Sequence, residues 1–134
     1  MPNSTKGSPW PIPELPRQSL YKGQSIEASV SSYLHSQGLS LIQRNFRCRQ
    51  GEIDLIAQQE DTLVFIEVRF RQQSAYGDPL ASVTRSKQRK IIQSARFFLM
   101  KHPLYLDRSC RFDVIGVTIQ EGHLVFDWIQ HAFY

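Results

Sequence analysis

Apolar residues recur along the chain at two spacings, one typical of helices and one of strands. A first helix is predicted over residues 21–37, where apolar side chains recur every three or four positions before a stop at Gly38. A second is predicted to begin after Thr84, which can cap it, and to end before Pro103. Its apolar stripe consists of Ile91, Ile92, Ala95, Phe98 and Leu99.

Five strand-like runs surround these helices. They occupy residues 40–47, 52–58, 63–71, 111–119 and 123–129. The first three follow one another with only short polar corners between them, which predicts an antiparallel meander. The order αβββαββ describes a central mixed sheet flanked by helices, which is α/β in class and borders on α+β.

The register of the second and third strands follows from the polar stretch between them. If residues 60–61 form a two-residue turn, paired residue numbers sum to 121. Ile56 then lies opposite Phe65, and Asp54 lies opposite Glu67 on the same face. Two acidic residues about 5 Å apart repel one another unless something positive lies between them.

This pair is the best candidate for chemistry in the chain. Asp54 and Glu67 supply the oxygen ligands that Mg²⁺ or Mn²⁺ prefers. Arg69 lies two residues beyond Glu67 on the same face, opposite Glu52 in the same register, where it could meet a phosphate. Taken without any resemblance, ion pairs with neighbouring arginines explain the two carboxylates as well as a metal does.

Three further polar residues lie in or beside apolar patterns. Gln88 is in phase with the apolar stripe of the second helix, and Glu27 follows Ile26 on the first. Each of these two, considered alone, is more typical of a satisfied amide or a solvated carboxylate. Asp113, between two apolar residues of a strand, is expected to be a structural ion-pair partner.

Length and composition limit the architecture. The first 18 residues contain five prolines and predict a flexible Pro-rich arm, which leaves a single domain at 19–134. Cys48 and Cys110 lack metal-ligand spacing, which favours a reduced, cytoplasmic setting. No apolar run reaches the roughly 20 residues that a membrane span requires, so no membrane contact is expected.

Positive charge is concentrated in one part of the chain. Residues 69–111 hold ten Lys or Arg against two Asp, in a protein with a net charge of +4. Such a surface suits nucleic-acid phosphates, although a solvated basic helix without a partner is the alternative. The candidate nucleic-acid contacts are Arg71, Arg85, Lys87, Arg89 and Lys90.

Four motifs in fixed order resemble the YraN family of uncharacterised bacterial proteins. They are GEIDLIA from Gly51, VFIEVRFR from Val64, VTRSKQRKI from Val83 and RFDVI from Arg111. The family is placed in the restriction-endonuclease-like superfamily, which carries the PD-(D/E)XK nuclease motif. Within that superfamily it is most similar to archaeal Holliday-junction resolvases.

The resemblance implies a role for each candidate. Asp54 matches the metal-binding Asp of the motif, Glu67 its second carboxylate, and Arg69 the place of its Lys. Glu27 matches an acidic residue on the first helix, and Gln88 a polar residue on the helix after the core. Because a guanidinium stays protonated, Arg69 cannot act as a general base. Lys87 or a metal-activated water would then have to supply that function.

Three functions remain open from the sequence. The preferred one is a Mg²⁺-dependent phosphodiesterase, an endonuclease that acts on structured or branched DNA, as a homodimer by analogy with junction resolution. The second is a catalytically inactive nuclease-like DNA-binding module. The third is a protein-interaction adaptor that uses the Pro-rich arm and Trp10.

Overall fold

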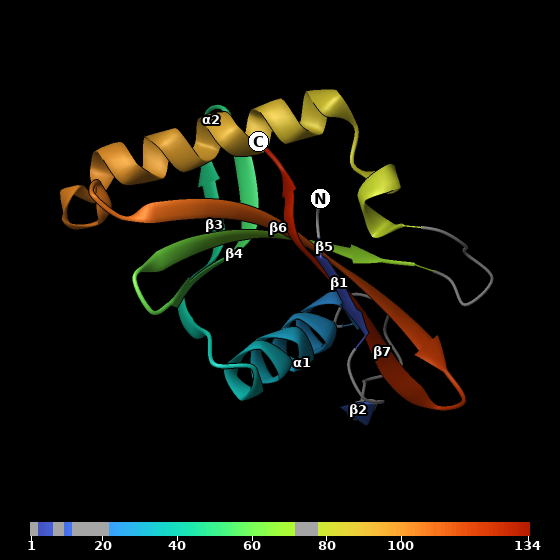
Figure 1. Cartoon of the computed structure of the whole chain (residues 1–134). Coiled ribbons are helices and arrows are strands. Elements are labelled where there is room, and N and C mark those ends of the chain that lie inside the picture. Colours follow the sequence, from blue (N-terminus) through green and yellow to red (C-terminus); the bar gives the residue numbers. More distant parts are fainter. Residues whose placement is uncertain (1–2, 7–9, 12–21, 72–77) are drawn as a thin grey trace.

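One mixed sheet with a helix on each face makes up the fold in this computed structural model, which describes residues 3–6, 10–11, 22–71 and 78–134 (Figure 1). In chain order the elements are β1 (Asn3–Lys6), β2 (Trp10–Pro11), α1 (Lys22–Ser36), β3 (Ser40–Cys48), β4 (Gly51–Gln59), β5 (Thr62–Phe70), the 3₁₀ turn η2 (Pro79–Ser82), α2 (Arg85–Lys101), the 3₁₀ turn η3 (Pro103–Tyr105), β6 (Ser109–Gln120) and β7 (His123–Phe133). The predicted order of two helices and five long strands is confirmed.

The strand order in the sheet is β1-β7-β6-β5-β4-β3, and β2 also pairs with β7. β5 and β6 are parallel, whereas the other described neighbours are antiparallel. The predicted meander of β3, β4 and β5 is therefore confirmed. Five long strands and two helices of this arrangement make the domain α+β, the second of the two classes that the sequence left open.

The described parts of the predicted N-terminal arm lie against the sheet. β1 pairs with β7 from Asn3 opposite Gln130 to Lys6 opposite Asp127. β2 continues along the same strand with Trp10 opposite Leu124. The remaining residues of the arm lie outside the described ranges. None of the described helices is long and apolar enough to cross a membrane.

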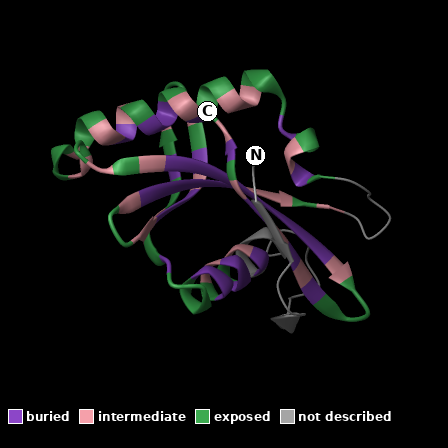
Figure 2. Ribbon diagram, in the orientation of Figure 1, coloured by how far each residue is buried: buried purple, intermediate pink, exposed green. Residues whose placement is uncertain are grey.

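The sheet separates two apolar clusters (Figure 2). α1 covers one of them through Ile26, Val30, Tyr33 and Leu34. α2 covers the other, and of its predicted stripe Ile91, Ala95 and Phe98 are buried while Ile92 and Leu99 are half-buried. α2 begins where the sequence predicts, because the Thr84 hydroxyl accepts a hydrogen bond from the Lys87 amide at 3.1 Å.

The register of the β4–β5 hairpin is also confirmed. Ile56 lies opposite Phe65 and Leu55 opposite Ile66, so that paired numbers sum to 121. Gln59 opposite Thr62 closes the hairpin around the turn at 60–61. Its first residue, Glu60, has a positive φ of 53°.

Beyond Leu55 the two strands stop pairing, and this corrects one expectation. Glu52 does not lie opposite Arg69; its register partner is Arg47 of β3, and the two side chains form an ion pair at 3.4 Å. The cause is a bend in β4 at Asp54: Ile53 packs in the α2 cluster, whereas strict alternation from Leu55 would direct it to the other face. The end of the β3–β4 hairpin therefore leans toward α2.

Gly51, at the start of β4, permits this approach. Its φ is +151°, and a Cβ placed there would lie 3.3 Å from Ser94 Oγ and 3.4 Å from Lys90 Cβ. The hairpin backbone consequently packs directly on α2.

Candidate functional site

Asp54 lies where β4 bends away from β5, and its carboxylate takes the place of a ladder partner. Its Oδ2 accepts a hydrogen bond from the backbone amide of Val68 at 2.8 Å. Glu67 precedes that amide on β5 and is buried, with 3% of its surface exposed. The bend and the hairpin register thus bring two carboxyl groups together beside a backbone amide.

Glu67 is surrounded by opposing influences. Its Oε2 is 3.6 Å from Arg69 Nη1 and 3.8 Å from Lys87 Nζ. Its Oε1 is buried and receives no hydrogen bond from a donor in the described ranges. Burial, and after it the charge and proximity of the Asp54 carboxyl, raise the pKa of Glu67 to about 8, although Lys87 and Arg69 act to lower it. The site therefore favours the protonated form of Glu67.

Arg69, near the C-terminal end of β5, is held in place by the turn η2. Its Nε donates to Ser82 Oγ at 3.1 Å, and that hydroxyl donates to the Pro79 carbonyl at 2.7 Å. Pro79 itself rests on Gly116 of β6, where a Cβ would lie only 2.6 Å from Pro79 Cγ. The turn η2 therefore fixes the guanidinium beside Glu67.

Lys87 enters the site from the first turns of α2. The sequence placed it among the basic residues expected to bind nucleic acid, and as a substitute for the motif's Lys. Only the packing of α2 over β5 shows that its ammonium group faces Glu67, on the same oxygen as Arg69. Two cations and two carboxyl groups thus meet on the α2 side of the sheet, where β4 stops pairing with β5.

Gln88 is not brought to the carboxyl pair by any described contact. Its Nε2 donates to the Val83 carbonyl at 3.0 Å, just before α2 begins. The half-buried side chain lines a different hollow, together with Arg85 and Arg89. Its phase with the apolar stripe was predicted correctly, but neighbouring Lys87 is the residue that faces Glu67.

Glu27 also lies apart. On α1, its Oε2 is 3.4 Å from Asn45 Nδ2, a contact between exposed groups. Within residues 3–6, 10–11, 22–71 and 78–134, no group of three or more His, Cys, Asp or Glu side chains is placed to hold a metal ion. Of the three predicted metal ligands, Asp54 and Glu67 lie together, whereas Glu27 contacts Asn45 instead.

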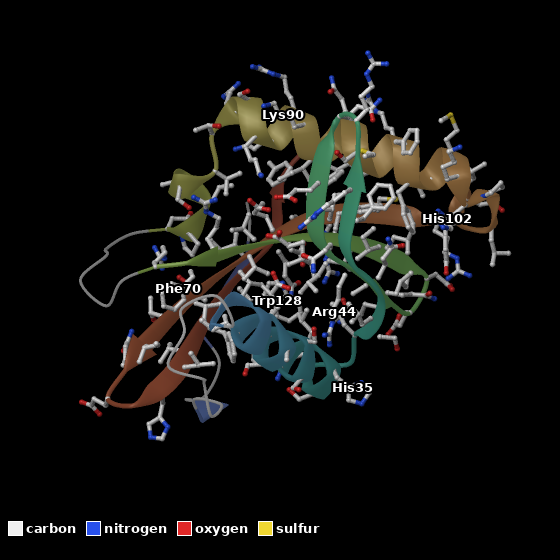
Figure 3. The ribbon with its side chains drawn as sticks, turned by 180° about the vertical axis from the view of Figure 1, so that it is seen from behind. His35, Arg44, Phe70, Lys90, His102 and Trp128 are labelled. Carbon is white, nitrogen blue, oxygen red and sulfur yellow. The ribbon has the colours of Figure 1, made fainter. Side chains whose placement is uncertain are left out.

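The remaining basic candidates lie on α2 or at the end of β5. Arg85, Arg89 and Lys90 are exposed on α2, whereas Arg71 is half-buried beside Gly116. Figure 3 shows Lys90 on the part of α2 beside the β3–β4 turn. There, a hollow of about 350 Å³ is lined by Arg47, Cys48, Gly51, Glu52, Lys87 and Lys90. This hollow adjoins the carboxyl pair through Lys87.

The sequence model of the uncharacterised protein family UPF0102 matches residues 26–117, more than half of the chain. This chain belongs to UPF0102. The matched part contains all four residues that meet in the site: Asp54, Glu67, Arg69 and Lys87.

Several UPF0102 proteins are similar over most of their length. One from Alcanivorax borkumensis is 48% identical over 121 residues, which cover 90% of this chain and 97% of that protein. One from Aeromonas hydrophila is 49% identical over 113 residues, 84% of each chain. A third, from Chromohalobacter salexigens, is 48% identical and covers 84% of this chain and 89% of its own.

A solved structure, Pyrococcus furiosus SfsA in complex with Ca²⁺, is 11% identical with a TM-score of 0.37. The match covers 81% of this chain and 62% of that chain. A likeness this weak carries no argument about fold or function.

The UPF0102 site can do three things chemically. Its paired carboxyl groups can exchange a shared proton for a metal cation, because either one offsets the repulsion between two carboxylates at short range. Arg69 and Lys87 can bind an anionic group such as a phosphate. The exposed basic side chains of α2 can bind further phosphates of a longer anion whose first phosphate is held by Arg69 and Lys87.

Proposed function

We propose that this UPF0102 protein binds structured or branched DNA and hydrolyses a phosphodiester bond in it with a divalent cation, Mg²⁺ or Mn²⁺. The observation that carries the proposal is the buried Glu67 beside Asp54, with Arg69 and Lys87 on one of its oxygens. The proposal includes a restriction-endonuclease-like fold. A mixed sheet with a helix on each face supports this fold, as do the PD-(D/E)XK-like residues on β4 and β5.

The side chains present fit a hard cation. Glu67 Oε1 is a buried acceptor without a described donor, and burial together with the nearby Asp54 carboxyl raises the pKa of Glu67. A cation between the two carboxyl groups would offset their repulsion. Mg²⁺ is commonly bound by one or two carboxylates, with waters and substrate phosphate oxygens completing its shell. Asp54 and Glu67 would hold it. When bound, such an ion lowers the pKa of a coordinated water and offsets charge on phosphate oxygens.

The two cationic side chains would position the substrate. Arg69 is permanently charged and fixed by Ser82, so it can hold a non-bridging phosphate oxygen and offset charge that develops during the reaction. Lys87 approaches from α2 and can hold a second oxygen of the same phosphate. Together they would orient the scissile phosphate over the carboxyl pair.

The basic residues of α2 would extend this contact along the nucleic acid. Arg85, Arg89 and Lys90 are exposed and lie on either side of Lys87 along the helix. Binding through them should weaken steeply as salt rises, because counterions are released from each neutralised phosphate. A symmetric homodimer would present two such edges to a branched substrate.

The test is a cleavage assay with Mg²⁺ or Mn²⁺ on four-way junction, flap and linear DNA. Asp54→Asn and Glu67→Gln should abolish cleavage while retaining DNA binding, and calorimetry should show that both lose Mn²⁺ binding. Asp61→Asn, a carboxylate in the exposed β4–β5 turn, is the matched control and should cleave normally. Cleavage that survives in both site variants would refute the assignment.

A second candidate, a nuclease-like module that binds DNA without cutting it, is favoured by one observation. Arg69 stands at the position where the nuclease motif has Lys, and arginine cannot accept a proton. DNA binding without cleavage under either metal, together with unchanged affinity in Glu67→Gln, would select this module over the enzyme.

A further inference from the structure

A second hollow lies on the other side of α2 from the β3–β4 turn. It has a volume of about 560 Å³ and is lined by Leu80, Arg85, Gln88, Arg89, Ala132, Phe133 and Tyr134. Three elements therefore build it: η2, the N-terminal half of α2 and the end of β7. In Figure 1 the end of β7 reaches up to α2, which agrees with the shared lining.

A buried polar network directs β7 to this place. Asp113 of β6 is fully buried; its Oδ2 accepts from Trp128 Nε1 at 2.8 Å and its Oδ1 from the His131 amide at 3.1 Å. Arg111 Nε donates to the same carboxylate at 3.2 Å, which confirms Asp113 as a structural ion-pair partner. His131 has a positive φ of 52°, the mark of a bulge.

The bulge changes which residues of β7 face α2. Phe112 pairs with Phe133, but Val114 pairs with Ile129, so β7 contains extra residues between these two points. Ile129 and Ala132 consequently pack in the same apolar cluster although their numbers differ by an odd step. The end of β7 is thereby directed over the α2 cluster and toward Arg85 and Arg89.

The lining has the chemistry of a nucleotide site. Arg85 and Arg89, one helical turn apart, are exposed, and neither forms an ion pair with a residue in the described ranges. Tyr134 is 86% exposed, and its ring meets Phe112 edge to face at 6.0 Å. Unpaired guanidinium groups beside an open aromatic ring suit a phosphate and a base respectively.

We propose that this hollow binds one unpaired nucleotide of the nucleic acid, with its base stacked on Tyr134 and its phosphate held by Arg85 and Arg89. A base can stack on an exposed ring only when it is outside a duplex. The substrate class is therefore DNA with unpaired nucleotides next to a duplex, as at a flap or a branch. This inference rests on the proposed nucleic-acid binding but does not depend on cleavage.

The test compares two fluorescein-labelled DNAs by anisotropy with the full chain: a blunt duplex, and the same duplex with a single-stranded overhang. Tyr134→Leu should weaken binding of the overhang DNA by about 5- to 100-fold and leave the duplex within about twofold. Tyr134→Phe and Tyr134→Trp should retain the preference, because both keep a ring to stack. Thermal melting confirms that each variant is folded.

The phosphate contact is tested separately. Arg85→Gln with Arg89→Gln should weaken binding of both DNAs and reduce the slope of affinity against salt, by about one to two released ions. Arg96→Gln, an exposed arginine farther along α2, is the matched control and should change neither.

The outcomes separate this inference from the function it builds on. If the wild type binds DNA and Tyr134→Leu binds both DNAs as the wild type does, or weakens both equally, the nucleotide site is refuted and DNA binding stands. If the wild type binds neither of these DNAs and also fails to bind four-way junction DNA, both proposals are refuted. Loss of cleavage in Asp54→Asn with an unchanged overhang preference supports the hollow as a site distinct from the carboxyl pair.

Discussion

A buried carboxyl group next to a second carboxyl group gives stability an unusual dependence on pH. The ordinary pKa of Glu67 is 4.5, and in the folded protein burial and Asp54 raise it to about 8. Between these values the native state keeps a proton that the unfolded chain has lost. The free energy of unfolding should therefore fall as pH rises through that window, the opposite of a salt-bridged surface acid.

Glu67→Gln should remove this slope, because an amide stays neutral throughout. In metal-free buffer we expect the variant to match the wild type near pH 5 and to exceed it at pH 9 by up to about 4 kcal/mol. Urea unfolding at the two pH values measures the difference. Glu52→Gln, an exposed carboxylate on the neighbouring strand β4, should keep the wild-type slope. An identical slope in Glu67→Gln would show that Glu67 is ionised in the native state.

Lys87 offers a second prediction for a single residue. If it positions the scissile phosphate, Lys87→Met should reduce kcat for DNA cleavage by about 100-fold, in the range of a lost electrostatic contact at a transition state. Lys90→Met, an exposed lysine three residues along the same helix, should mainly weaken binding and leave kcat within a few fold. Equal losses of kcat in the two variants would argue against a positioning role for Lys87.

The sequence predicts some of these residue contacts and misses others for a definite reason. The proximity of Asp54 to Glu67 follows from a two-residue turn and a period of two, both local, although ladder pairing ends at Leu55 opposite Ile66. The contact of Lys87 with Glu67 depends on how α2 crosses β5, which no local pattern encodes. The helical phase of Gln88 is correct, but its amide turns back to the Val83 carbonyl.

Among the elements, the short turn η2 positions Arg69 in the site. It carries Ser82, which holds Arg69, and it rests on β6 through the contact of Pro79 with Gly116. Only a residue without a Cβ allows this approach. Neither feature has a sequence signal beyond an isolated Pro and an isolated Gly, and so the element could not be predicted.

Gly116→Ala should push η2 off the sheet. Because the new Cβ would lie 2.6 Å from Pro79 Cγ, we expect a loss of about 1–3 kcal/mol in the free energy of unfolding. Pro79→Ala removes the clashing atom, so the double variant should recover part of that loss, and a double-mutant cycle measures the recovery. Strictly additive losses would mean that the two residues do not clash.

α2 is the opposite case, an element that the sequence predicts well. Thr84 caps it, and its apolar stripe packs on the sheet as the helical period requires. The bend in β4 is intermediate. The Asp54 position could be found from the pattern, but the departure of Ile53 from strict alternation could not, since it results from packing against α2.

At the scale of the whole molecule, β1 and β2 cover the outer side of β7. β7 would be an edge strand without β1 and β2, which cover its outer side at four and two positions respectively. The prolines of the N-terminal segment predict a flexible arm. Its pairing with β7 was not predictable, because strand pairing between distant segments leaves little trace in one sequence.

Deleting residues 1–11 should therefore expose the backbone donors and acceptors of β7. We expect a lower Tm and self-association that increases with protein concentration, as unpaired strand edges cause. Size-exclusion chromatography with light scattering at several concentrations measures this. A truncated chain with the same mass as the full chain at every concentration would show that β1 and β2 contribute no protection.

The parallel pairing of β5 with β6 has a consequence for the order of folding. The two strands pair along their length, from Thr62 opposite Ser109 to Phe70 opposite Val117, across a connection that contains η2 and α2. Closing so long a connection costs entropy before any pairing is gained, whereas the hairpins on either side close locally. Among the five long strands, we therefore expect the amides between β5 and β6 to be the last to become protected in pulse-labelled refolding. The contact of Lys87 on α2 with Glu67 on β5 would then form only at that late step.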